Sequence, residues 1–200
     1  MVEHRLVFDQ YEHPTEPNGW YIERNVLTPA ECDKLVLVAE SYPTYQDTMG
    51  YNNPNSDSAG DHRDTWIYWL PQDMGIPALN RMWTVFHDRM KHHNDNIWKF
   101  DLDVMNEKAQ YAKYEVGGHF GWHMDLGKEQ MSVRKLTAVI MLSDVSEYEG
   151  GMLQMFNNIA VPLGKGDAIF FPSFMLHRVT QVTKGTRRSA VLWAGGKFYS

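Results

Sequence analysis

Three His-x-Asp pairs are the features of this chain whose residue types and spacing most directly suggest metal chemistry. They are His62/Asp64, His93/Asp95 and His123/Asp125. Side chains two residues apart share a face of a strand but point to nearly opposite sides of a helix. The second pair falls at the end of a predicted helix, whereas the third follows a strand-like run and a glycine pair. We therefore predict that His123 and Asp125 bind one metal ion, with the first pair as the weaker alternative.

A third ligand is expected from a distant segment. Two imidazoles and one carboxylate on one side of a metal ion leave coordination positions open, which suits iron(II). His177 is our candidate, because it follows the strand-like run 167–172 and precedes another extended segment. The predicted metal ligands, and with them the catalytic centre, are His123, Asp125 and His177.

Composition restricts the classes of function. The chain has 200 residues, a net charge of −6 and one cysteine, Cys32. The acidic balance argues against binding nucleic acid through its phosphates, and no apolar run approaches the ~20 residues of a membrane span. The sequence starts without the apolar core of a signal peptide. We expect a cytoplasmic protein with no nucleic-acid or membrane partner.

Two helices are predicted before residue 100, after a short strand at 20–23. Thr28-Pro-Ala-Glu31 is a capping box with proline at the first helical position, so a helix should run from here to about residue 42. Apolar residues recur at three- and four-residue intervals between 76 and 97, which predicts a second helix with His87, His92 and His93 on its solvated side.

The rest of the chain is predicted to be strands and loops. The polar, turn-rich segment 43–62 is expected to be a mobile loop, and residues 63–70 have strand composition. Short strands with frequent turns then follow. We predict a mainly β (α+β) fold, a double-stranded β-helix or jelly roll with N-terminal buttressing helices. Residues 1–200 should form one domain, with helical support at about 20–108 and a catalytic core at about 109–195.

Between residues 110 and 193 four motifs occur in a family-specific order. They are Tyr114-x-x-Gly-Gly-x-Phe120-x-x-His123-x-Asp125, then Arg134-x-x-Thr137, then Gly150-Gly-Met-Leu153-Gln-Met-Phe156, and finally His177 with Thr186-Arg187-Arg-Ser189. In these motifs the chain resembles the iron(II)/2-oxoglutarate dioxygenases, and within them the prolyl 4-hydroxylase-like branch. The resemblance implies a hydroxylase of an unactivated C–H bond, foremost in a peptidyl proline, that uses Fe(II), 2-oxoglutarate, O₂ and ascorbate.

The resemblance also implies roles for further residues. Arg187 matches the cation that binds the distal carboxylate of 2-oxoglutarate, because a buried carboxylate needs a fixed cation with hydrogen-bond donors. Ser189 and Tyr114 would donate further hydrogen bonds to it. Arg188 is the alternative if the strand register slips by one residue, and Tyr111 is the alternative phenol.

Three positions match the substrate groove of that branch, and the nature of the substrate stays open. They are Arg63, Phe120 and Arg134. Met141 stands where some relatives have tyrosine. Hydroxylation of another amino-acid residue or small molecule is one alternative, and a cupin-type metal-binding isomerase without 2-oxoglutarate is another. The substrate is thus a peptide or a small molecule, and the sequence does not give the oligomeric state.

Overall fold

Antiparallel strands are the main regular structure in the part of the chain that the computed structural model describes, residues 19–47, 63–105 and 107–197. The first half contributes β1 (Tyr21–Glu23), β2 (Thr44–Asp47), β3 (Arg63–Leu70), β4 (Leu102–Val104), β5 (Ala109–Tyr114) and β6 (His119–His123). The second half contributes β7 (Arg134–Met141), β8 (Tyr148–Gly150), β9 (Leu153–Met155), β10 (Ile159–Ala160), β11 (Ala168–Pro172), β12 (His177–Val179), β13 (Val182–Gly185) and β14 (Arg187–Gly196).

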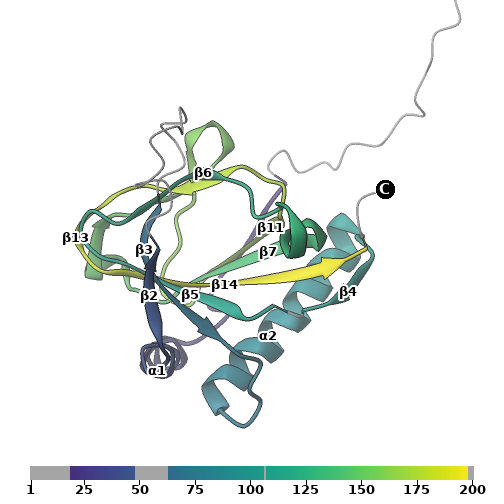
Figure 1. Ribbon diagram of the computed structural model, residues 1–200, viewed down its shortest axis with the longest axis horizontal. Coiled ribbons are helices and arrows are strands. Elements are labelled where there is room, and N and C mark those ends of the chain that lie inside the picture. The colour runs from purple at the N-terminus through teal and green to yellow at the C-terminus, as the bar shows by residue number, and fades with distance from the viewer. Residues whose placement is uncertain (1–18, 48–62, 106, 198–200) are drawn as a thin grey trace, which may run out of the picture.

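The main sheet rolls up because one strand belongs to both of its halves. Its order is β1-β11-β7-β14-β5-β3-β6-β12-β9-β10, with β2 added beside β3 and β4 beside β14. In β3, Trp66 to Leu70 pair with β5, while Arg63 and Asp64 pair with β6. The sheet therefore curls back over itself in the region of β6 (Figure 1), which is the jelly-roll architecture predicted from the sequence.

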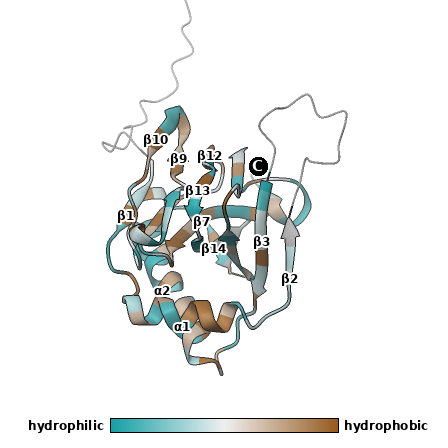
Figure 2. Cartoon of the chain, turned by 90° about the vertical axis from the view of Figure 1, so that its left-hand side faces the viewer, coloured by the Kyte–Doolittle hydropathy of each residue, from teal (hydrophilic) through white to brown (hydrophobic). Residues whose placement is uncertain are grey.

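Two helices lie on the outer face of the larger half of the sheet. They are α1 (Pro29–Ala39), which begins at the predicted capping box of Thr28 and Glu31, and α2 (Pro77–His93). A π-helical turn, η1 (Asn94–Trp98), continues α2. Figure 2 shows both helices on one side of the rolled sheet, with β9, β10 and β12 on the other. Within the described ranges, no helix has the length and apolar character to cross a bilayer.

The side chains of β14 alternate between the two sides of the sheet, and this alternation positions the site. Ala190 and Leu192 pack into the core between the sheet and the helices. Arg187, Ser189 and Val191 line a cavity inside the roll. The register with β5 is fixed by ladder pairs that include Arg187 with Tyr114.

The prediction of a loop over 43–62 is wrong at its start. Thr44–Asp47 forms β2, and the remainder, 48–62, lies outside the described residues, so its predicted mobility stays a prediction. The segment could be polar and still form a strand because, among the described residues, it pairs only with β3, at the edge. Thr44 adds a side-chain hydrogen bond of 2.9 Å to the carbonyl of Ile67.

The prediction that His93 lies on the solvated side of its helix is also wrong. His93 is 5% exposed. Its ring packs between Tyr21 and Phe170, and its Nε2 lies 3.3 Å from Glu23 Oε2. Helical periodicity could not reveal this contact, because the covering strand β1 comes from 70 residues away.

The burial of His93 predicts a dependence of stability on pH. Burial lowers the pKa of His93 below its ordinary value, although Glu23 opposes the shift. As the pH falls below about 6.5, the unfolded chain therefore takes up a proton at this position before the native state does, and the free energy of unfolding should decrease. In denaturant titrations from pH 7 to pH 5, we expect a shallower decrease for His93→Phe than for the native chain. The exposed His87→Phe should keep the native slope; equal slopes for all three would contradict this prediction.

Candidate metal centre

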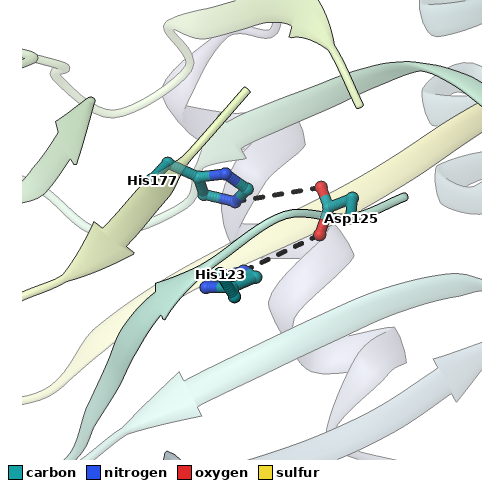
Figure 3. A group of neighbouring side chains, drawn as sticks. All are labelled: His123, Asp125 and His177. Atoms are coloured by element: carbon teal, nitrogen blue, oxygen red, sulfur yellow. Dashed lines mark ion pairs between the residues drawn. The ribbon is translucent and has the colours of Figure 1, made fainter. Parts of the chain in front are cut away.

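His123, Asp125 and His177 converge inside the roll. Their ligand atoms all lie within 4.8 Å of one another, and the described residues contain no second cluster of this kind. Asp125 Oδ1 lies 3.7 Å from His123 Nε2, and its Oδ2 lies 3.8 Å from His177 Nε2 (Figure 3). The convergence follows from pairing, because His177 opens β12 directly opposite His123 at the end of β6. Two ligands that are close in the sequence and one distant ligand thus face one point.

Backbone hydrogen bonds fix the orientation of both imidazoles. His123 Nδ1 lies 2.8 Å from the carbonyl oxygen of Gly121, and His177 Nδ1 lies 2.9 Å from that of Met175. With Nδ1–H donating to these carbonyls, each ring carries its lone pair on Nε2, the atom that faces the centre. The Phe120 ring stacks on His123 with centroids 3.5 Å apart and holds the imidazole from the side.

The carboxylate of Asp125 is held by hydrogen bonds of its own. Thr137 Oγ1 donates to Asp125 Oδ2 over 2.8 Å and lies 3.0 Å from Ser173 Oγ. Arg134 donates to the backbone oxygen of Asp125 over 3.2 Å. Thr137 thereby limits rotation of the carboxylate.

The charges of His123 and Asp125 suit a cation. Burial and the neighbouring His177 hold the pKa of His123 well below its ordinary value, so the ring is neutral at pH 7. Burial by itself would raise the pKa of Asp125, but His177, His123 and the hydrogen bond from Thr137 outweigh it and keep this pKa low. One anionic carboxylate and neutral imidazoles are the protonation states that bind a divalent metal ion.

The hydroxyl of Thr137 gives a first test of the centre. Thr137→Val keeps the shape of the side chain but removes the donor to Asp125, and loss of such a partner typically costs 10–100-fold in metal affinity. We expect the dissociation constant for Fe(II) or Mn(II), measured by calorimetry, to rise by about that factor. Thr65→Val is the matched control, because Thr65 is equally buried but donates to the backbone of Lys113. Unchanged metal affinity in Thr137→Val would show that Thr137 does not orient the ligand.

The other two His-x-Asp pairs do not form such a centre. His93 contacts Glu23, whereas Asp95 forms an ion pair with Lys91 on the helix surface. Asp64 pairs with His119 across β3 and β6, and its partner in the sequence motif, His62, lies outside the described residues.

The metal-facing side chains line a cavity of about 540 Å³ that extends to Arg187. We call it the front cavity. Its walls include five large aromatic side chains: Tyr45, Trp69, Tyr114, Phe120 and Trp193. Trp69 and Trp193 lie 6.3 Å apart, and Trp69 donates a hydrogen bond to the Tyr45 hydroxyl.

Arg187 is a buried cation without an acidic partner among the described residues. It is 1% exposed. Its Nη1 donates to Ser189 Oγ over 3.0 Å and its Nη2 contacts Met141 Sδ at 3.3 Å, while Nε has no hydrogen-bond partner. The aromatic ring of Tyr114 lies 5.2 Å from Cζ. An uncompensated buried guanidinium is costly, so this arrangement fits a carboxylate ligand.

The alternatives to Arg187 and Tyr114 face the other side of the sheet. Arg188 lies 3.3 Å from both Glu40 and Glu147 on the outside. Tyr111 donates to Glu40 over 2.8 Å and packs in the core under the helices. Neither lines the front cavity.

Two of the three predicted substrate positions contact each other at the cavity wall, and the third is engaged elsewhere. Arg63 Cζ lies 4.4 Å from the Phe120 ring centroid. Arg134 also lines the cavity, but its Nε donates to Glu107 over 2.8 Å and its guanidinium lies 3.8 Å from the Trp193 ring. Arg134 thus supports the wall and the backbone of Asp125.

Sequence reasoning missed Trp193, Trp69 and Glu107. Strand alternation from Arg187 would have placed Trp193 on the cavity side, and alternation along 63–70 would have done the same for Trp69. Glu107 carries no signal of its own, because its partner Arg134 is 27 residues away.

Residues 109–195 match the sequence model of the 2OG-Fe(II) oxygenase superfamily. This part of the chain belongs to that superfamily. The matched segment contains the three converging side chains and the buried Arg187.

Curated relatives of this 2OG-Fe(II) oxygenase domain include PKHD-type hydroxylases. The protein of Acidovorax ebreus (strain TPSY) is 37% identical over 93 residues, covering 42% of this chain and 41% of the relative. That of Hyphomonas neptunium is 38% identical over 93 residues, with the same coverage. The match thus spans about two fifths of the length of these relatives.

Solved 2OG-Fe(II) oxygenase structures share the fold over most of the chain. A Pseudomonas putida prolyl-4-hydroxylase superposes with a TM-score of 0.67 at 17% identity, covering 90% of this chain and 94% of its own. A Trichoplax adhaerens prolyl hydroxylase, solved with a peptide fragment of hypoxia inducible factor, gives 0.69 at 19% identity, covering 90% and 84%. These likenesses confirm the predicted jelly roll.

Proposed function

We propose that this protein is an Fe(II)/2-oxoglutarate-dependent hydroxylase and that its substrate is a peptidyl proline. The observation that carries the proposal is Arg187. A buried guanidinium lacking an acidic partner stands in the same cavity as two imidazoles and a carboxylate. A structural arginine would have an acidic partner, whereas a cupin-type isomerase needs no buried cation there.

The residues that line the front cavity fit both Fe(II) and 2-oxoglutarate. His123 Nε2, His177 Nε2 and a carboxylate oxygen of Asp125 would hold iron(II), and three protein ligands leave positions for small molecules. Bound iron would supply the redox chemistry by which 2-oxoglutarate, O₂ and a C–H bond give succinate, CO₂ and an alcohol. Ascorbate would serve as a reductant that keeps the iron in the ferrous state.

Arg187 would bind the distal carboxylate of 2-oxoglutarate and so orient its keto-acid end toward the metal ligands. Ser189 and Tyr114 flank the guanidinium, and their hydroxyls are the nearby donors for the same carboxylate. The aromatic walls exclude water from this region and strengthen the ion pair. The side chains of β14 and β5 would thus position the cosubstrate.

A peptide substrate is supported by the relatives and by the shape of the site. Two structural neighbours are prolyl hydroxylases, and one of them was solved with a peptide. Tyr45, Phe120 and Trp193 give the front cavity aromatic surfaces, on which a proline ring packs without losing rotamer entropy.

The decisive experiment measures cosubstrate turnover and product together. The full chain with Fe(II), 2-oxoglutarate, ascorbate and a library of proline-containing peptides should release succinate in proportion to peptides that gain one oxygen atom. Asp125→Ala should abolish both signals, and Asp103→Ala, at an exposed acid, should keep them. Succinate release without any oxidised peptide would contradict the proline assignment. No succinate with any peptide or cell extract would contradict the hydroxylase assignment.

A further inference from the structure

A second, smaller cavity is lined by Arg187 but by none of the metal ligands. Its volume is about 230 Å³, and we call it the back cavity. Apart from Arg187, its walls come from the segment between the end of β7 and Leu163, and they include Met141, Val145 and Tyr148. None of the metal ligands lines it, whereas Leu153 and Arg187 line both cavities. Arg187 is therefore a charged residue that the two spaces share.

The contacts of the guanidinium show which atoms face the back cavity. A methyl group placed on Gly151, which lines the back cavity, would lie 3.0 Å from Arg187 Cδ. The neighbouring atom Nε has no hydrogen-bond partner. Nη2 contacts the sulfur of Met141, which also belongs to the back cavity. Nη1 instead donates to Ser189, which belongs to the front cavity.

These contacts leave two of the three guanidinium nitrogens, Nε and Nη2, without a strong acceptor. A thioether sulfur is a weak acceptor, so Nη2 gains little from Met141. A carboxylate in the back cavity would accept from Nε and Nη2 in the two-pronged geometry that guanidinium and carboxylate groups prefer. The front cavity would then retain only the donor shared with Ser189.

The other residues that line the back cavity indicate the chemistry of the rest of the ligand. Of the residues that line the back cavity, Arg187 is the only charged one, and Val145, Met152, Val161, Pro162 and Leu163 give it apolar walls. Val145 is 64% exposed and Met152 is 49% exposed, so both lie at the opening to solvent. A small molecule with one carboxylate and a short alkyl chain matches this distribution, because its chain would cover apolar surface between the guanidinium and the opening.

We propose that the back cavity binds short-chain monocarboxylates and that its occupant weakens binding of the cosubstrate. The weakening of cosubstrate binding rests on the proposed function, since the monocarboxylate and 2-oxoglutarate would share the single charge of Arg187. Coupling between two ligands is reciprocal, so 2-oxoglutarate would weaken monocarboxylate binding by the same factor.

Arginine side-chain NMR of the ¹⁵N-labelled full chain without added metal tests binding directly. The Nε–H signal of Arg187 is assigned by its absence in Arg187→Met. Butyrate should shift this signal saturably, acetate should do so with weaker affinity, and chloride should give no saturable shift. Val145→Trp, which narrows the opening, should weaken butyrate binding at least tenfold. Val116→Trp is the matched control, because Val116 is 66% exposed and lines neither cavity.

The outcomes separate the two proposals. If butyrate bound Val145→Trp with the same affinity as the native chain, the anion would reach Arg187 from the front cavity, and the back-cavity site would be overturned. The absence of any butyrate-induced shift in the native chain would overturn it as well. Calorimetry on the Mn(II)-loaded chain should give a 2-oxoglutarate dissociation constant that rises at least threefold with saturating butyrate, but not in Val145→Trp. If butyrate binds as expected and 2-oxoglutarate does not bind, the proposed function fails while the monocarboxylate site stands.

Discussion

Replacing Arg187 by methionine is expected to weaken 2-oxoglutarate binding by about 2–5 kcal/mol, or roughly 30-fold to several thousand-fold in the dissociation constant. The reason is that the distal carboxylate of 2-oxoglutarate would lose the buried guanidinium proposed to bind it. Calorimetry with Mn(II) in place of iron measures this constant without turnover. Arg188→Met removes a guanidinium that lies outside, against Glu40 and Glu147, and should leave the constant unchanged.

The same variant should be more stable than the native chain in the absence of ligand. Arg187 is buried with an unpaired Nε, and a buried donor without a partner costs about 1–3 kcal/mol. Methionine removes that cost and fills part of the space. Denaturant unfolding should therefore give a higher free energy of unfolding for Arg187→Met. A marked loss of stability would instead make Arg187 a structural residue and contradict its assignment as a cosubstrate ligand.

The second large effect is expected at the metal centre. Asp125→Asn keeps the size of the side chain but removes the one negative charge among the three ligands, so the dissociation constant for Fe(II) should rise by more than about 100-fold, beyond the cost of losing a hydrogen-bond partner of a ligand. Circular dichroism should show the native fold. Asp103→Asn, at an exposed acid, provides the control; metal affinity within tenfold of native in Asp125→Asn would remove Asp125 from the ligand set.

Local patterns were sufficient to predict the residues that approach one another within a strand or a motif. The two-residue spacing of His123 and Asp125 and the alternation along 187–193 depend only on strand geometry. The capping box of Thr28 and Glu31 is likewise a local interaction, and it is present in the structure. Predictions of this kind need no knowledge of how distant segments pair.

Features created by long-range pairing could not be predicted in this way. The edge position of β2 depends on β3 being its sole partner, which a polar sequence does not indicate. His93 is buried because β1 covers it, and Arg134 is paired because Glu107 approaches it. The back cavity likewise depends on segments that meet only in the folded chain.

Anaerobic titration of the Fe(II)-loaded chain with 2-oxoglutarate tests the central claim most directly. If the three ligands hold iron and Arg187 holds the distal carboxylate, a visible charge-transfer band should appear and saturate with 2-oxoglutarate. It should be lost in Asp125→Asn and require far more 2-oxoglutarate in Arg187→Met. A chain that binds iron but develops no band at any concentration of 2-oxoglutarate would contradict the account.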